Sequence, residues 1–122
     1  MTNTTSQKLR SARATLDSHN QSPRKVRLVA NLVKGKKISD ALTALEFLPK
    51  RAAEPVAKVI KSAAANAKQK GENPDELTVA NVTVESAGML KRYMPRAFGR
   101  AALIRHKKSR VKVTLAPAAK AK

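Results

Sequence analysis

The spacing of apolar residues in the first half of the chain predicts three helices. Ser22-Pro23 opens the first helix, with the serine hydroxyl as the expected N-cap and the proline at the first helical position. Gly35 is expected to end this helix, because glycine readily adopts the left-handed conformation that follows many helices. The apolar stripe between them is Val26, Val29, Ala30 and Val33.

Two further helices are expected after the first. Ser39 is expected to cap a short helix that Pro49 terminates, with the apolar positions Ala41, Leu42, Leu45 and Leu48. The next helix is expected at about Lys50 to Gln69, with the apolar stripe Val56, Val59, Ile60, Ala63 and Ala67. Pro55 would clash with an earlier carbonyl inside a helix, so either this helix bends or its regular part starts at about Glu54.

The hydrophobic period changes from 3.6 to 2 after a turn at Gly71 to Asp75. Leu77 to Ser86 alternates, and one face of this predicted strand is Thr78, Ala80, Val82 and Val84. A second alternating stretch lies near the end of the chain, at Val111, Val113 and Leu115, and we expect the two stretches to pair antiparallel. A short strand within Leu9 to Leu16 fits the pattern more loosely.

The segment between the two predicted strands, Ala87 to Arg110, has to leave the domain and return. An arm of about ten residues in each direction would project roughly 30 Å. The expected fold class is therefore α+β, with three helices packed on a small antiparallel sheet and a long protruding β-hairpin. A two-stranded hairpin of that length is marginal in water, so we expect it to be mobile in the free protein and ordered inside a partner.

Basic residues are concentrated at the two ends of the chain. The protein has 122 residues, 26 Lys+Arg, 8 Asp+Glu and a formal net charge of +18. Residues 1–37 hold nine basic residues and one acid, residues 38–85 are nearly neutral, and residues 86–122 hold eleven basic residues and no acid. Such unbalanced charge on a small chain predicts a polyanionic partner.

Composition also sets the expected organisation. Residues 8–115 are expected to form one domain, with the hairpin at about 85–110, while residues 1–7 and the basic tail 116–122 are expected to be disordered. Cysteine is absent, which excludes disulfides and is typical of a reducing compartment. No apolar run approaches the roughly 20 residues of a membrane span, and the first residues lack the apolar core of a secretory signal. Asp17 argues against an organellar transit peptide.

The first candidate binding site is the start of the first helix, Ser22-Pro23-Arg24-Lys25-Val26-Arg27. Cations in a first turn are unfavourable beside the positive end of the helix. A phosphate reverses that balance, since free backbone N–H groups and the basic side chains would converge on one anion. The alternative is a solvated basic face, but Lys36 and Lys37 at the far end of the same helix favour phosphate binding.

The second candidate site is the predicted hairpin, from Leu90 to Arg100 and on through Arg105-His106-Lys107-Lys108-Ser109-Arg110. Nine basic residues lie between Lys91 and Lys112, and no carboxylate within the segment matches them. The alternative is a solvated charge run or a nuclear-localisation-like patch. The two flanking strands favour a hairpin, because a disordered basic tail has no need of them.

Few residues remain for other chemistry. Only Phe47, Tyr93 and Phe98 are aromatic, and the helix that carries Phe47 needs it for the core, so the chain lacks the stacking platforms of single-strand readers. Recognition should rest on phosphates, 2′-hydroxyls and the shape of folded RNA. His19 and His106 have no metal-ligand or general-base partner at suitable spacing. No metal, cofactor, small-molecule substrate or catalytic residue is therefore expected.

Four stretches resemble a known family in their order and spacing. They are Ser22 to Ala30, Gly35-Lys36-Lys37, Ala63-Ala64-Ala65-Asn66-Ala67 and Leu90 to Ala101. Together they resemble the bacterial-type family of large-subunit ribosomal protein twenty-two, from about residue 12 to residue 115. The resemblance implies a small α+β domain on the outside of the large subunit, near the exit of the nascent-peptide tunnel. It also implies a hairpin whose tip forms part of the tunnel wall.

The same resemblance implies partners and site residues. The partners would be several domains of the large-subunit ribosomal RNA, whose assembly the protein joins early, neighbouring large-subunit proteins, and the nascent peptide. The place would be the ribosome of the cytoplasm, of bacterial type. The tunnel-lining tip would be Leu90, Lys91, Arg92, Met94, Pro95, Arg96 and Ala97. The residues expected to contact ribosomal RNA are Arg10, Arg13, Ser22, Arg24, Lys25, Arg27, Lys34, Lys36, Lys37, Lys91, Arg92, Tyr93, Arg96, Arg100, Arg105, His106, Lys107, Lys108 and Arg110.

Some positions depart from the family pattern. Ser86-Ala87-Gly88 replaces an acidic residue followed by Gly-Pro, which is expected to make the start of the hairpin more flexible, and Phe98 stands where a basic residue is common. The leading interpretation is a structural RNA-binding protein of the ribosome. A free-standing basic nucleic-acid-binding protein of chromatin or regulatory type is the main alternative, and an enzyme acting on RNA is another.

Overall fold

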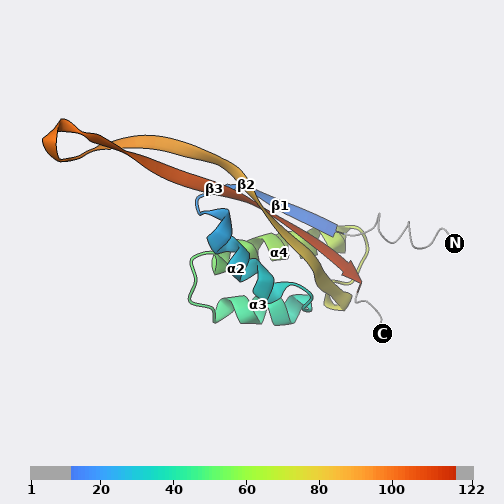
Figure 1. Ribbon diagram of the computed structural model, residues 1–122. Helices are drawn as coiled ribbons and strands as arrows, with labels where there is room; N and C mark the ends of the chain where they lie inside the picture. The colour runs from blue at the N-terminus through green and yellow to red at the C-terminus, as the bar shows by residue number, and fades with distance from the viewer. Residues whose placement is uncertain (1–11, 118–122) are drawn as a thin grey trace.

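The computed structural model of the protein describes residues 12–117. Within them the chain forms three α-helices, a three-stranded antiparallel sheet and two 3-10 turns, which confirms the expected α+β class (Figure 1). The elements in chain order are β1 (Ala12–His19), α2 (Pro23–Val33), α3 (Ile38–Glu46), α4 (Ala53–Gln69), η1 (Pro74–Glu76), β2 (Leu77–Pro95), η2 (Ala97–Gly99) and β3 (Ala101–Pro117).

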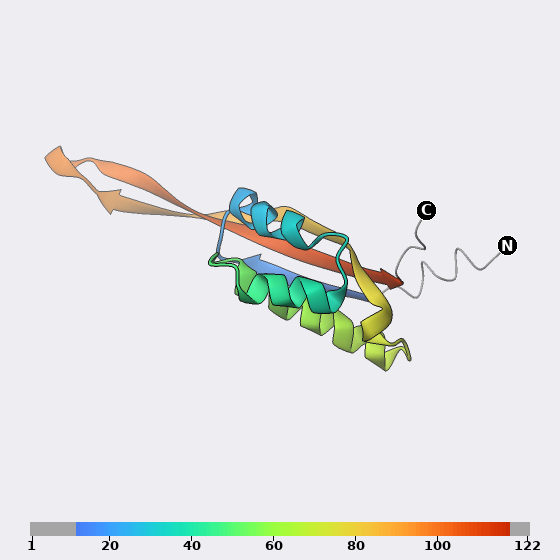
Figure 2. The ribbon, with the colours of Figure 1, turned by 90° about the horizontal axis from the view of Figure 1, so that it is seen from below.

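The sheet has the order β1-β3-β2, so the last strand in the sequence is the central one. Ala12 lies opposite Leu115, and Val84 lies opposite Val111, so the two predicted alternating stretches pair antiparallel as expected. All three helices pack against one face of the sheet, and its other face is left open (Figure 2). The helices and the part of the sheet that they cover, which we call the base, therefore form a two-layer structure with one hydrophobic core.

The apolar stripes predicted for the two longer helices are the ones that form this core. The buried residues of α2 are Val26, Val29, Ala30 and Val33, and those of α4 include Val56, Val59, Ile60, Ala63 and Ala67. In α3, Ala41 and Leu45 are buried, while Leu42 and Leu48 are partly buried against the core. The sheet contributes Val79, Val82, Val84, Val111, Val113 and Leu115.

The helix ends differ from the sequence prediction in two details, and the alternative that the last helix starts at about Glu54 is confirmed. Ser22 does precede α2, but its side chain makes no capping hydrogen bond. The prediction that Ser39 caps the next helix was wrong, because α3 begins at Ile38 with Lys37 in the N-cap position. Pro55 falls in the first turn of α4, where its missing N–H would have had no acceptor within the helix, so α4 starts at residue 53.

The faces of β2 were assigned incorrectly, because a bulge interrupts its pairing with β3 between Val79 and Asn81. The extra residue inverts the alternation, so Leu77 and Val79 are buried on the same side as Val82 and Val84. Of the predicted face, Ala80 is exposed and Thr78 is only half-buried.

Two more expectations need correction. β1 runs to His19, three residues past the end of the predicted stretch Leu9 to Leu16, whose first three residues lie outside the described part of the chain. Phe47 directly follows α3 and is 77% exposed, so it does not belong to the core. The buried side chains of the strands are mainly those of the β-branched residue valine, which packs well on a sheet with one covered face.

Beyond the base, β2 and β3 continue together as a two-stranded arm (Figure 1). The arm starts at a second bulge, between Ser86 and Met89, where Gly88 has a φ of +103°. Pairing then runs to Pro95, and the turn η2 closes the hairpin. No residue from 88 to 108 is buried. β3 itself extends to residue 117, two residues past the expected domain end, while residues 1–7 and 118–122 lie outside the described range.

Candidate nucleic-acid interface

The first turn of α2 combines exposed cations with backbone N–H groups that the helix leaves free. Arg24 and Lys25 are exposed there, and the turn contains no acidic residue. The first backbone N–H groups of a helix have no acceptor within the helix, and here the Ser22 side chain does not supply one. An external phosphate would therefore meet unsatisfied N–H groups, the positive end of the helix and two cations at one place.

Arg27 has a different role from its neighbours on α2. Its guanidinium donates to the Val84 carbonyl, with Nη2 3.0 Å and Nε 3.3 Å from the oxygen. Val84 lies on β2, an outer strand of the sheet, so the arginine satisfies an acceptor that strand pairing leaves open. Arg27 thereby fastens the start of α2 to the sheet close to the root of the arm.

The cations at the far end of α2 form a separate group. Lys34, Lys36 and Lys37 are exposed, but an eleven-residue helix places them about 15 Å from the first turn. Their loop pairs with the outer edge of β2: the Gly35 N–H donates to the Val79 carbonyl at 2.7 Å, and the Val79 N–H donates to the Lys36 carbonyl at 2.8 Å. The two ends of α2 are thus two basic patches and not one.

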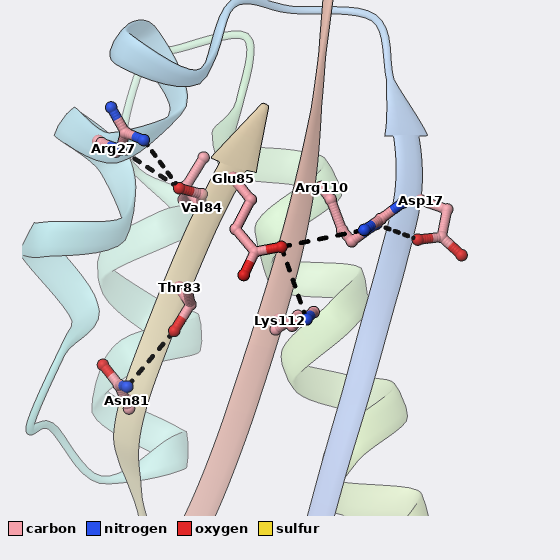
Figure 3. Close-up of polar contacts among 8 residues, drawn as sticks. All are labelled: Asp17, Arg27, Asn81, Thr83, Val84, Glu85, Arg110 and Lys112. Carbon is pink, nitrogen blue, oxygen red and sulfur yellow. Dashed lines mark hydrogen bonds and ion pairs between the residues drawn. The ribbon is translucent and has the colours of Figure 1, made fainter. Parts of the chain in front are cut away.

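The open face of the sheet carries an ion-pair network across all three strands (Figure 3). Arg110 Nε lies 2.7 Å from Asp17 Oδ1, and Arg110 Nη1 lies 3.9 Å from Glu85 Oε2. Lys112 Nζ lies 3.5 Å from the same Glu85 oxygen. Arg110, which the sequence suggested as an RNA contact, therefore already has two carboxylate partners at the root of the arm.

Of the two RNA contacts predicted at the start of the chain, the structure describes only one. Arg13 is exposed on β1 opposite Thr114, and Arg10 lies outside the described residues. The Arg13 carbonyl accepts a hydrogen bond from Asn66 Nδ2 at 2.7 Å, which ties α4 to the outer strand β1. This bond gives a structural reason for an asparagine in an otherwise alanine-rich stretch of α4.

The cations of the arm are exposed along both strands. The turn itself spans Arg96 to Arg100, and the Arg96 N–H donates to the Arg100 carbonyl at 2.6 Å. Leu90 to Pro95, expected at the tip, belongs to the strand that leads to it. Phe98 stands at the turn with a φ of +61° and is 98% exposed. The exposed predicted contacts of the arm are Lys91, Arg92, Tyr93, Arg96, Arg100, Arg105, His106 and Lys107, while Lys108 is half-buried.

Sequence reasoning missed the residues that organise the root of the arm, namely Asp17, Glu85 and Lys112. Glu85 lies directly opposite Arg110, and this pairing depends on strand register, which the sequence alone does not give. Among residues 12–117, no three His, Asp or Glu side chains are grouped as metal ligands. No helix in that range is long and apolar enough to cross a membrane.

Comparison with known proteins covers both the base and the arm. Residues 14–116 match the family described as Ribosomal protein L22p/L17e. The chain is 50% identical over 103 residues to the large ribosomal subunit protein uL22 of Pelobacter propionicus, covering 84% of this chain and 93% of that protein. It is 49% identical over 106 residues to uL22 of Geobacter metallireducens, with 86% and 96% covered. For uL22 of a Sulfurihydrogenibium species, the identity is 48% over 105 residues, with 86% and 90% covered. The chain therefore belongs to the L22p/L17e family of ribosomal proteins.

Proposed function

We propose that this protein is a structural constituent of the large ribosomal subunit. It binds the large-subunit ribosomal RNA, aids its assembly and lines the nascent-peptide exit tunnel with its arm. Family membership supports this function, since the relatives carry the name of a large-subunit protein and match nearly their whole length. The protein is not an enzyme: it acts by neutralising charge and by wedging its arm between RNA domains.

The arm is the structural feature that supports the proposal most directly. The arm has no buried residue from 88 to 108, and no carboxylate follows Glu85 in the sequence. A paired ribbon of that length, with cations on both strands and no core, lacks the burial that would stabilise it in water. Embedding in RNA supplies both the counter-charge and the contact surface that the arm lacks by itself.

The contacts with RNA fall at three places in this proposal, the two basic patches at the ends of α2 and the arm. The first turn of α2 binds a phosphate through Arg24, Lys25 and its free N–H groups. The arm contributes further cations, and among the described residues from Lys91 to Lys112 only Arg110 and Lys112, at its root, have a carboxylate partner. The scarcity of aromatic residues supports recognition of folded RNA by phosphates and shape, and not by base stacking.

The turn of the arm is the part that we propose for the tunnel wall. Arg96, Ala97 and the exposed Phe98 would face the nascent peptide, and Leu90 to Pro95 would lead to it along the strand. Neighbouring large-subunit proteins would contact the base. The relatives compared are bacterial, which supports the cytoplasmic ribosome of a bacterium as the place of action.

Sedimentation of cell extract through a gradient, at moderate and then high salt, tests the proposed function. We expect the protein to stay with the large subunit through the high-salt wash, because the inserted arm makes shape-dependent contacts in addition to the electrostatic attraction. Purely electrostatic binding falls by orders of magnitude over a few-fold rise in salt concentration. Release at modest salt, or migration with DNA, would instead favour a free-standing nucleic-acid-binding protein.

A further inference from the structure

The two outer strands of the sheet differ in how far the rest of the chain covers their free edges. On β2, the Val79 backbone pairs with the loop that follows α2, and the Val84 carbonyl accepts from Arg27. On β1, the Arg13 carbonyl accepts from Asn66 of α4. Uncovered N–H and C=O groups of an outer strand are available for pairing with another chain. Any such groups on β1 are therefore a candidate site of contact with a partner.

Thr15 presents uncovered backbone groups. In an antiparallel pair, alternate residues direct their N–H and C=O toward the partner strand, and the residues between them direct theirs away. Because the Arg13 carbonyl bonds to α4, the N–H and C=O of Thr15, two residues later, also face away from β3. Within residues 12–117, no hydrogen bond outside the sheet involves the Thr15 backbone. The free edge is short, since regular pairing ends at a bulge after Leu16.

A groove of about 610 Å³ lies between this edge and α4, which run side by side (Figure 2). Its β1 wall is formed by Ala14, Thr15 and Leu16, and its α4 wall includes Pro55 and Val59. Ala14 and Leu16 pack against the core but are only half-buried. An extended segment beside Thr15 would cover these side chains and pair with the free backbone groups, which is the geometry of β-strand addition.

The charges around the groove favour a partner with a carboxylate. Glu54 and Lys58 line the groove and form an ion pair with each other at 3.5 Å. The His19 ring is hydrogen-bonded to Gln21 at 3.1 Å. Arg51 also lines the groove and is exposed, and no acidic side chain of residues 12–117 pairs with it. One unmatched cation beside an apolar strip therefore fits an extended peptide with an acidic side chain.

RNA fits this groove less well than a peptide does. Phosphate groups would supply acceptors for the Thr15 N–H but would leave the Thr15 carbonyl without a donor. The Glu54 carboxylate, which lines the same groove, would repel them. The α4 wall also belongs to the nearly neutral part of the sequence, residues 38–85, and not to its two basic ends.

We propose that the groove between β1 and α4 binds an extended acidic segment of a neighbouring large-subunit protein, which adds to the sheet beside β1. This proposal rests on the proposed function and specifies how a neighbouring protein contacts the base. The Asn66 bond closes one end of the free edge and the bulge closes the other, so the paired part of the segment is about four residues, or roughly 13 Å. Its carboxylate pairs with Arg51.

Photo-cross-linking in intact large subunits tests the groove. Ser62, which is exposed and lines the groove, is replaced by the photoreactive amino acid benzoylphenylalanine in the full-length protein. Large subunits that contain this protein are purified and irradiated, and mass spectrometry maps the cross-linked peptide. We expect cross-links to a single stretch of one large-subunit protein, with an Asp or Glu in that stretch. Cross-links to ribosomal RNA alone, or none to any protein, overturn the groove.

Two pairs of matched variants, made in the same cross-linking protein, test the contacts themselves. Thr15→Pro removes the outward N–H, whereas Thr15→Val removes the hydroxyl and keeps the N–H. Arg51→Glu reverses the unmatched cation, whereas Lys61→Glu makes the same change of charge on α4 outside the groove. We expect Thr15→Pro and Arg51→Glu each to lower the yield of the protein cross-link about tenfold, and both controls to stay within about twofold of the unchanged protein.

The outcomes separate the groove from the proposed function. Equal yields in Arg51→Glu and Lys61→Glu, or equal losses in Thr15→Pro and Thr15→Val, overturn the groove. The ribosomal function stands in those cases if mass spectrometry finds the wild-type amount of the protein in washed large subunits. Unsubstituted protein that is absent from large subunits overturns both. If Thr15→Pro fails to fold, the variants at Arg51 and Lys61 decide.

Discussion

At the scale of single residues, cations that look alike in the sequence have different environments. Arg24 and Arg27 lie on the same stretch of α2, but within residues 12–117 only Arg27 of the two has an acceptor, the Val84 carbonyl. Arg110 likewise has Asp17 and Glu85 as partners. The sequence could predict that this stretch of helix is basic. Which of its cations forms a hydrogen bond within the protein depends on a carbonyl 57 residues away.

Replacing Arg27 by methionine should lower the free energy of unfolding by about 1 kcal/mol, because the Val84 carbonyl loses a charged donor. Arg24→Met is the matched control, and we expect it to change stability by less than about 0.5 kcal/mol. Urea denaturation of the two variants measures the difference. Equal losses would show that the bond from Arg27 contributes nothing to the fold.

Ser109 is fully buried, and its hydroxyl has no hydrogen-bond partner in the part of the chain that the structure describes. Ser109→Ala should therefore raise the free energy of unfolding by about 1 kcal/mol, since it removes a desolvated and unpaired polar group. The exposed Ser86, which lies opposite it, provides the control, and Ser86→Ala should leave the thermal midpoint unchanged. A lower midpoint for Ser109→Ala would contradict the buried hydroxyl being unpaired.

At the scale of elements, the apolar periodicity predicted more than the capping residues did. The helical stripes and the antiparallel pairing follow from apolar spacing, and both are confirmed. The bulge at Ala80 and the start of α3 at Ile38 were not predictable, because each depends on how the segment docks onto the rest of the sheet. The ion pairs of Glu85 were missed for the same reason, since register decides which residues face one another.

Gly88 lies in the bulge at the junction between the base and the arm, and its backbone conformation shapes that bulge. Its φ of +103° is strained for any residue with a side chain, although nothing lies within 4 Å of where a Cβ would stand. Gly88→Ala should therefore cost about 1–3 kcal/mol in the local bulge through backbone strain and not through crowding. We expect faster amide exchange in the arm with little change in the global thermal midpoint. Ala87→Ser is the control, and equal exchange in both variants would argue against strain at position 88.

At the scale of the whole molecule, stability and RNA binding are divided between two parts. The base contains the hydrophobic core, which Ile60, Val113 and Leu115 help to fill, and no residue of the arm from 88 to 108 is buried. The arm is therefore free to carry like charges close together, because the stability of the fold does not depend on it. The open face of the sheet joins the two parts through the ion pairs around Glu85.

Replacing Met89 to Lys107 by the two-residue turn Asn-Gly tests this division. We expect the shortened protein to unfold within a few degrees of wild type, because no core contact is removed. It should also leave the large subunit at lower salt than wild type in gradient sedimentation. A shortened protein that fails to fold would show that the arm stabilises the base.

The position of β3 has a consequence for how the protein is made. This strand is synthesised last, but it is the centre of the sheet, and Ala12 must find Leu115 across nearly the whole chain. While the polypeptide is growing, β1 and β2 have no strand between them, and the helices have no complete sheet to cover. Closure of such a long loop is slow and leaves apolar surface exposed in the meantime. The sheet can therefore close only after β3 has been synthesised, and we expect it to form in one step and not progressively from β1 onwards.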